Sequence, residues 1–373
     1  MVKQKTLVFY FLILVTFMLL PLPIKNALLI IESNNSDISN FNKKTLFSTD
    51  IAEGYRNFLF YRFFKKSLNG KQVIVGKDDF LFLGNNYASV IDKTQGLYQY
   101  KTEEIERWTD KLLYLQNWYQ KKNIQFILVI APNKHSIYND KLPHKIIYKM
   151  GRTITDDITR IASSKNINIL DLRNELRKNK KKYDNLLYLK TDTHWNGLGA
   201  SIAYEKTIDY LNERYNKNYI TPSYTYKKVS DSGKDLSKFL KIKSILPKNH
   251  EISIWFDFNI KQDICIGGID KKTYNLDICK FEEDPIYSIN NQPKYTINHR
   301  ALNKEKVLII SDSFSRHNSQ LYNKTFENIW KFHFKHLNGE NLSEFVNIHK
   351  PDIVIYQVVE RSLYNQKMVT ELR

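Results

Sequence analysis

The stretch at residues 307–314, VLIISDSF, decides how the chain folds. The apolar run, which begins at Lys306 and ends at Ile310, is typical of a strand buried on both faces of a sheet. The polar residues that follow predict a turn before a helix. Ser313 therefore stands at the carboxyl end of a buried strand, where reactive groups collect in open α/β sheets.

Similar apolar runs alternate with helical periodicity along the chain, which predicts an α/β fold with a mainly parallel sheet and helices on both faces. The predicted strands are 125–131, 167–172, 186–189, 306–310 and 352–356, and the predicted helices are 102–122, 153–164 and 197–215. Residues 73–75 and 80–83 flank a polar turn and predict a β-hairpin. Residues 220–300 change character, and their short strand-like pieces at 253–258 and 273–281 predict a β-rich insertion.

The N-terminus predicts export. Lys3 and Lys5 precede an unbroken apolar stretch at residues 7–24, which is close to the shortest that spans a bilayer. A secretory signal has the same pattern, but no small-x-small cleavage site follows, so an uncleaved transmembrane helix is preferred. The predicted organisation is an anchor at 1–25, a polar stalk at 26–50 and one domain at 51–373. The expected location is the inner membrane, single-pass, with the domain periplasmic.

The charge and the cysteine content restrict which partners and metal sites can be expected. The formal net charge is +18, but the lysines are scattered, which favours a solvated surface over a binding footprint; attraction to anionic lipid or acidic polysaccharide is the alternative. Nucleic acid is excluded as a partner because the chain is exported. Cys265 and Cys279 lack metal-ligand spacing, so a zinc site is not expected. A disulfide and two buried thiols both remain open.

A second chemical motif lies at residues 190–197, KTDTHWNG, between a strand end and a helix. A serine hydroxyl needs a neighbouring base to become a nucleophile, and His194 has a pKa suited to that task. Asp192 can bond the far ring nitrogen and fix its tautomer. The Ser313 N–H is a candidate oxyanion donor. The predicted catalytic residues are Ser313, His194 and Asp192.

Each motif alone has an ordinary structural interpretation. An Asp-Ser pair after an apolar strand is most often a turn with a helix-capping residue. His317, one helical turn after Ser313, is a rival base. The adjacent carboxylate of Asp192 favours His194 over His317. The joint occurrence of both motifs at strand ends in an exported chain favours catalysis.

These motifs resemble those of the SGNH hydrolase-like proteins of polysaccharide O-acetylation, the alginate O-acetyltransferase (AlgX/AlgJ-like) family. Residues 76–82, 132–143 and 351–361 match the family pattern in the same order. The resemblance implies a three-layer α/β/α domain in which Ser313 is the nucleophile, His194 the base and Asp192 its orienter. As in the family, the Asp and His precede the serine. Ser311 replaces the usual glycine, and the insertion at 220–300 is poorly matched.

Five further residues are predicted to contact substrate, and four of them have an ordinary alternative. They are Lys134, Tyr138, Trp195, Asn196 and Arg361. Lys134 and Tyr138 follow a predicted strand end, or are simply loop residues. Trp195 either stacks on a sugar or packs in the core. Arg361 either holds an acyl or sugar oxygen or pairs with Glu360 or another carboxylate.

The resulting hypothesis is an O-acetyltransferase acting on an exported polysaccharide through an acyl-enzyme. The resemblance implies a membrane-bound O-acyltransferase as acetyl donor. No cofactor or metal is expected. One alternative is a carbohydrate acetyl esterase with the same triad, which differs only in using water as acceptor. The other is a non-catalytic polysaccharide-binding component of an acetylation machine.

Overall fold

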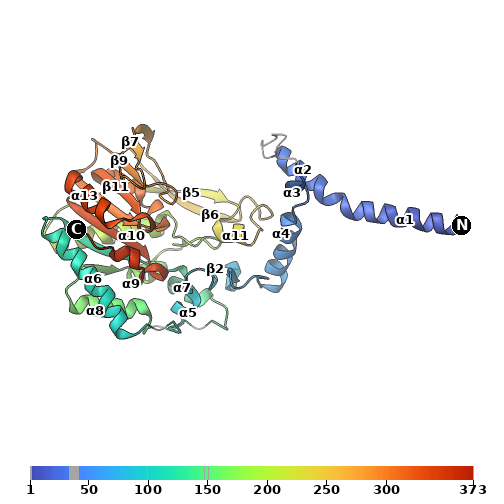
Figure 1. Cartoon of the computed structure of the whole chain (residues 1–373), viewed down its shortest axis with the longest axis horizontal. Coiled ribbons are helices and arrows are strands. Elements are labelled where there is room, and N and C mark those ends of the chain that lie inside the picture. The colour runs from blue at the N-terminus through green and yellow to red at the C-terminus, as the bar shows by residue number, and fades with distance from the viewer. Residues whose placement is uncertain (1, 33–41, 99, 147, 150, 373) are drawn as a thin grey trace.

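The computed structural model describes residues 2–32, 42–98, 100–146, 148–149 and 151–372. The main body contains an eight-stranded sheet beside a long N-terminal helical extension (Figure 1). In spatial order, the strands of the sheet are β4 (Ile169–Asp171), β3 (Gln125–Ala131), β12 (Ile353–Val359), β10 (Asn303–Ser311), β11 (Phe326–His333), β9 (Lys294–Ile297), β7 (Asp263–Gly268) and β8 (Lys280–Glu283).

The sheet is mixed, which corrects the prediction of a mainly parallel one. The five strands from β4 to β11 run parallel to one another. Buried apolar runs predicted four of them, whereas β11 was not predicted. The insertion then adds β9, β7 and β8 as antiparallel strands at one edge. The outermost strand, β8, has the sequence KFEE and is exposed throughout, which suits an edge, where one side of the ladder meets solvent.

Helices cover both faces of the sheet, so the predicted three-layer α/β/α architecture is confirmed. One face packs against α6 (Thr102–Gln120), α8 (Ile154–Ser164) and α13 (Gly339–His349). The other packs against α9 (Arg173–Lys182), α10 (Gly197–Tyr215) and α12 (Ser319–Thr325). Along β3, Phe126 and Leu128 enter the first core and Ile127 and Val129 the second, because side chains alternate across a strand.

The insertion supplies more than the edge strands. β5 (Thr225–Asp231) and β6 (Glu251–Asp257) form a separate antiparallel pair, with the short helix α11 (Asp235–Phe239) between them in sequence. The predicted strand at 273–281 is wrong for most of its length, since the chain turns at Tyr274 with a positive φ of 59°. Residues 186–189 form only an isolated bridge from Tyr188 to Trp195. Cys265 and Cys279 form a disulfide between β7 and the residue before β8.

The predicted hairpin is confirmed as β1 (Val73–Val75) paired with β2 (Leu81–Leu83). It packs over a small separate core together with α5 (Val90–Thr94) and α11. The helix α4 (Asp50–Leu59) continues into the π-helix η2 (Phe60–Phe64), which contributes Tyr61 to the same core.

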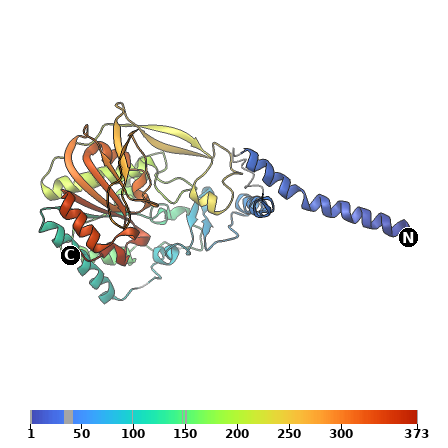
Figure 2. The same cartoon turned by 45° about the horizontal axis from the view of Figure 1, so that its top comes forward.

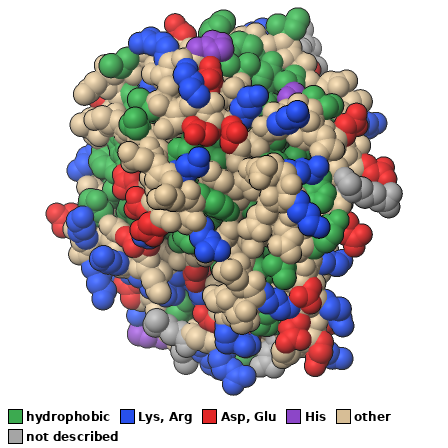
Figure 3. All heavy atoms as spheres, turned by 90° about the vertical axis from the view of Figure 1, so that its left-hand side faces the viewer, with side chains coloured by type: hydrophobic (Ala, Val, Ile, Leu, Met, Phe, Trp, Pro, Cys, Tyr) green, Lys and Arg blue, Asp and Glu red, His purple; other side chains and the backbone are tan. Residues whose placement is uncertain are grey.

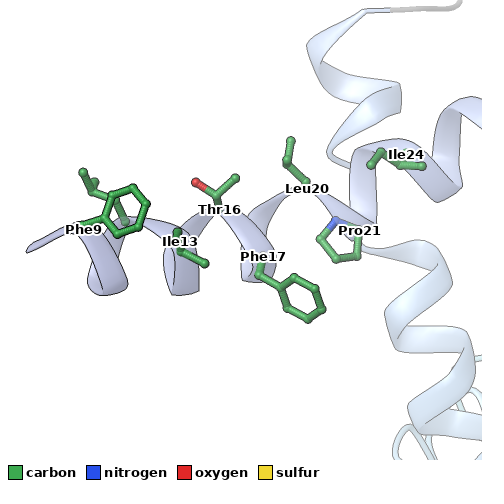
Figure 4. Close-up of a pocket in the computed structure, with 8 residues that line it drawn as sticks. Phe9, Ile13, Thr16, Phe17, Leu20, Pro21 and Ile24 are labelled. Atoms are coloured by element: carbon green, nitrogen blue, oxygen red, sulfur yellow. The ribbon is translucent and has the colours of Figure 1, made fainter. Parts of the chain in front are cut away.

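One N-terminal helical stretch, Thr6–Leu28, is long and apolar enough to cross a membrane. It takes in most of α1 (Val2–Leu19) and the start of α2 (Pro21–Glu32), so it reaches beyond the predicted anchor into the predicted stalk. The Asn/Ser-rich part of that stalk, residues 33–41, lies outside the described residues. Apolar side chains project to different sides of α1 and border an open hollow of about 550 Å³ (Figure 4). Thr16 is the one polar residue that lines this hollow.

The end of the molecule farthest from α1 carries mixed charge. Figure 3 shows Lys and Arg side chains interspersed with Asp and Glu over this face. The net charge of +18 therefore makes no single-sign patch on this face.

Candidate active site

Ser313 begins a short 3-10 helix, η5 (Ser313–Arg316), immediately after β10. The buried carboxylate of Asp312 accepts from the N–H of Phe314 at 3.0 Å and from the N–H of Val359 at 2.7 Å. The first bond caps η5, and the second ties the turn to the end of β12. The conformation of the serine turn is therefore fixed by the strand next to it.

Two more contacts hold the same turn. The buried ammonium of Lys331, on β11, donates to the Ser315 carbonyl at 2.8 Å. The Ser311 hydroxyl donates to the Ser315 hydroxyl at 2.7 Å. Ser311 stands where the family usually has glycine, and its hydroxyl adds a hydrogen bond across the turn.

The loop before α10 delivers His194 to this turn. Asn196 caps α10 by accepting from the N–H groups of Leu198 and Gly199, which fixes where the loop ends. The buried indole of Trp195 donates to the Phe314 carbonyl at 3.0 Å. This bond joins the histidine loop directly to the serine turn, although the two are 119 residues apart in sequence.

The structure brings the three predicted catalytic side chains together. His194 Nε2 lies 2.8 Å from Ser313 Oγ, and His194 Nδ1 lies 2.8 Å from Asp192 Oδ1. The same Asp192 oxygen accepts from the His194 backbone N–H at 3.0 Å. The carboxylate thus holds both the ring and the backbone of the histidine, leaving Nε2 toward the hydroxyl.

Charge in the site is arranged around the imidazole. Burial alone would lower the pKa of His194, but the hydrogen bond and charge of Asp192 outweigh it and raise that pKa. Burial also opposes ionisation of Asp192, yet its hydrogen bond and charge pairing with His194 hold the pKa of this carboxyl well below its usual range. Asp192 is therefore a carboxylate near neutral pH, suited to stabilise a positively charged imidazole.

A second carboxylate, Asp235, stands beside the first, and sequence reasoning missed it. Its Oδ2 lies 3.6 Å from His194 Nδ1, and its Oδ1 accepts from the Thr193 N–H at 2.9 Å. Burial and the charge of Asp192 raise the pKa of Asp235 to about 6. Asp235 begins α11 in the insertion, and no short motif around it marks it as part of the site.

The three groups Asp192, His194 and Asp235 offer ligand atoms within 4.8 Å of one another. Hydrogen bonds already account for these atoms: Asp192 and the Thr193 hydroxyl contact His194 Nδ1, and Asp235 accepts from Thr193. A cation bound here would have to replace those bonds. The donor set therefore fits an oriented imidazole better than a metal centre.

The site opens into a cleft of about 330 Å³. Its lining contains the three predicted catalytic side chains, the carboxylate of Asp235, four cations and two aromatic rings. The cations are Lys234, Lys238, Lys243 and Arg316, and the rings are Trp255 and His317. Most of this wall comes from the insertion and from η5, so these two parts of the chain shape the space for substrate.

The predicted substrate contacts lie elsewhere. Within the described part of the chain, Lys134, Tyr138, Trp195, Asn196 and Arg361 do not line the cleft. Trp195 and Asn196 are buried, and their polar atoms make the loop contacts described above. The Tyr138 hydroxyl accepts from the Leu187 N–H, so this ring is a core residue. For these three residues the ordinary structural interpretation describes their position.

Arg361 lies beside the site without entering the cleft. Its Nη1 donates to Asn133 at 3.1 Å, and its guanidinium lies 5.7 Å from the centre of the Phe314 ring. Glu360 pairs with Arg173 at 3.7 Å and not with Arg361. The rival base His317 packs 5.6 Å from the Trp255 ring, and burial lowers its pKa to about 3.

Lys134 is buried and binds backbone instead of substrate. Its ammonium donates to four carbonyls: Leu81 at 2.8 Å, Leu189 at 2.6 Å, Lys190 at 2.7 Å and Asp192 at 3.0 Å. Burial lowers the pKa of Lys134 to about 8, so the group is still mainly cationic at neutral pH. Lys134 thus fixes the backbone that carries Asp192.

Replacing Lys134 should destabilise the fold. In Lys134→Met, buried carbonyls lose their donor, and each such loss costs about 1–3 kcal/mol, so we expect a decrease of at least about 3 kcal/mol in the free energy of unfolding. Lys111→Met, at an exposed position on α6, is the matched control. Denaturant unfolding measures both. Equal stability of the two variants would show that the four contacts contribute nothing.

Part of the chain is similar to a known protein family. Residues 73–248 match the family described as SGNH hydrolase-like domain, acetyltransferase AlgX. The match covers 176 of the 373 residues of the chain. The AlgX-like segment includes Asp192, His194 and Asp235 but ends before Ser313, so the geometry alone associates Ser313 with these residues. No curated protein matches the chain in sequence.

Solved structures extend the likeness beyond the AlgX-like segment. The Bacillus cereus PatB1 structure with a sulfonyl adduct is 15% identical, with a TM-score of 0.58 over 80% of this chain and 100% of that one. A DHHW family protein from Eubacterium siraeum is also 15% identical, with a TM-score of 0.55 over 82% of this chain and 97% of that one. At this identity the likeness establishes a shared fold.

Proposed function

We propose that this protein is an O-acyltransferase that moves acetyl groups onto hydroxyls of an exported polysaccharide. The observation that carries the proposal is the continuous hydrogen-bonded path from Asp192 through His194 to Ser313 at the floor of a cleft. The acetyltransferase family of residues 73–248 supports acetyl as the transferred group.

In the proposed first step, Ser313 Oγ attacks the acetyl carbonyl of the donor while His194 Nε2 takes its proton. The carbonyl π electrons move onto oxygen, and the Ser313 N–H is our candidate donor to this oxyanion. When the intermediate collapses, the bond to the leaving group breaks and His194 returns the proton to it. The product is acetyl-Ser313, with Asp192 stabilising the imidazolium in between.

In the second step, a sugar hydroxyl attacks the acetyl ester of Ser313. His194 takes the proton from the hydroxyl, and the ester bond to Oγ breaks as the proton passes to Ser313. The net reaction exchanges one ester for another and regenerates the free serine. A water molecule in place of the sugar would give hydrolysis, so the acceptor decides between transferase and esterase.

The acceptor can be identified directly. The purified protein would be given a chromogenic acetyl ester with and without oligosaccharide, and the free acetate and acetylated sugar would be quantified. We expect the sugar to capture most of the acetyl groups and to reduce free acetate. Release of acetate alone, unchanged by any oligosaccharide, would identify an esterase and contradict the transferase proposal.

The cationic wall of the cleft suits an acidic polymer. Lys238 and Lys243 are exposed, and the insertion places both at the cleft. We expect Lys238→Glu with Lys243→Glu to raise KM for an acidic oligosaccharide about tenfold at low salt, with little change in kcat, because rim charges act on encounter and binding. The matched control is Lys228→Glu, on β5 outside the cleft. A KM that is independent of these substitutions and of salt would indicate a neutral acceptor.

We further propose that the helical stretch Thr6–Leu28 anchors the protein in the inner membrane with its domain on the periplasmic side. Its length and its lack of buried surface support this location. The acetyl donor would then be a membrane-bound O-acyltransferase, whose product reaches Ser313 from the membrane side.

A further inference from the structure

The helix formed by α4 and η2, residues 50–64, has one face packed on the domain. Asn57 donates to the Leu240 carbonyl at 2.8 Å, and Tyr61 is buried in the small core beside Leu240. Gly54 lies so close that a Cβ there would stand 2.5 Å from the Lys241 carbonyl oxygen. These residues recur at helical spacing, so the inner face of the helix is already covered.

The opposite face carries large apolar side chains in the open. Tyr55 is 51% exposed, Leu59 50% and Phe63 73%, and these three are spaced four residues apart on one stripe. Phe64, 63% exposed, extends it. We call these four residues, three aromatic and one aliphatic, the aromatic stripe. Because the inner face of the same helix is covered by the domain, the aromatic stripe needs a second apolar environment.

The beginning of α4 is held next to the candidate membrane span. The buried amide of Asn26, which lies within Thr6–Leu28, donates to the Leu46 carbonyl at 2.7 Å and to the Ser48 carbonyl at 3.0 Å. In both Figure 1 and Figure 2, α4 runs across the direction of α1. If α1 crosses the bilayer, α4 lies along the bilayer surface at the end of the span.

The charges around the aromatic stripe also suit a position at the bilayer surface. Exposed cations stand on and directly after the helix, at Arg56, Arg62, Lys65 and Lys66. Lys65 and, more distantly, Arg62 also contact Asp79. The two acidic residues of α4, Asp50 and Glu53, both pair with Lys241 of the domain. Helices that lie in the membrane interface combine aromatic side chains in the acyl boundary with cations at the headgroups.

We propose that α4–η2 is a membrane-docking helix, with the aromatic stripe inserted in the headgroup region of the bilayer that holds α1. A lipid surface is the occupant that the structure favours, because Asn26 ties the start of α4 to the span. The inner face of the helix packs on residues 240–241, which continue from α11 and its Asp235. Docking would therefore hold one wall of the cleft at a fixed distance from the bilayer, independently of the chemistry at Ser313.

The test uses the full-length protein in liposomes of phosphatidylcholine and phosphatidylglycerol. Cys265 and Cys279 are paired, so a single introduced cysteine is the one thiol available for a nitroxide spin label. Labels are placed by Phe63→Cys and, as the matched control, Ile348→Cys. Ile348 is 65% exposed on α13, at the opposite end of the molecule from α1 (Figure 1). Thermal unfolding by circular dichroism checks that both variants are folded.

Collision rates with dissolved oxygen and with a water-soluble nickel complex report the depth of each label. We expect the label at position 63 to lose collisions with nickel severalfold relative to position 348 and to gain collisions with oxygen. Equal nickel accessibility at the two positions would overturn the proposal. So would spin–spin broadening between labels at position 63, which would mean that a second copy covers the stripe, or protection seen only after a membrane-bound acyltransferase is added.

Discussion

Ser313→Ala should reduce acyl transfer by at least about 10⁴-fold while leaving the fold intact, because the variant removes the atom that would carry the acetyl group. The Ser313 hydroxyl accepts or donates one hydrogen bond, to His194, and the turn around it is held by Asp312 and Lys331 instead. The loss should therefore appear in kcat and not in stability. Initial rates with an acetyl ester and oligosaccharide measure the first, and thermal unfolding the second.

Ser288→Ala is the matched control, since Ser288 also lines the cleft. It should retain activity within a small factor of the unmodified protein. A sulfonyl fluoride probe adds an independent readout: an activated serine hydroxyl attacks the sulfonyl group, and we expect the reagent to modify Ser313. Equal labelling of the Ser313→Ala variant would show that the activated nucleophile is another residue.

Asp192→Asn should cost about 10³- to 10⁴-fold in kcat, because an amide no longer fixes the tautomer or stabilises the imidazolium. Asp235→Asn is the matched comparison. Asp235 is farther from Nδ1 and reaches the ring partly through Thr193, so we expect a loss closer to tenfold. A larger loss in Asp235→Asn than in Asp192→Asn would reverse the assignment of the two carboxylates.

The pH dependence of kcat tests how the charge of Asp192 affects the pKa of His194. His194 acts as a base only when neutral, and the pKa of His194 is raised above its ordinary value of 6.5, so kcat should fall as pH decreases through that raised pKa. Removing the Asp192 charge lowers the pKa of His194. The acid limb of Asp192→Asn should therefore move to lower pH even though its maximum rate is smaller. An acid limb that stays in place would show that another group controls it.

The sequence predicted the parts of this molecule that depend on local pattern. The apolar run before Ser313 predicted β10, and the positions of Asp192 and His194 before α10 predicted where the imidazole would stand. The structure places these residues at hydrogen-bond distance, as proposed. The sequence did not predict that β9, β7 and β8 would extend the sheet next to β11. Their pairing depends on contacts that their own short sequences do not specify.

The misplaced residues have a common physical cause. Lys134 follows a strand end, which is a sound reason to expect a surface role, but its partners are backbone carbonyls from two distant segments, at Leu81 and at residues 189–192. Backbone carbonyls leave no trace in a residue pattern. Asp235 was missed for a related reason: it comes from the insertion and meets His194 only when α11 packs against the histidine loop.

The most direct measurement of the central claim is the identity of the acylated residue. The full-length protein would be mixed briefly with an acetyl donor, quenched in acid and digested, and its peptides analysed by mass spectrometry with and without polysaccharide. We predict an acetyl ester on Ser313 that accumulates with donor alone and disappears when polysaccharide is added. Acetylation at another side chain, or acetyl-Ser313 that persists in the presence of every acceptor, would contradict the account.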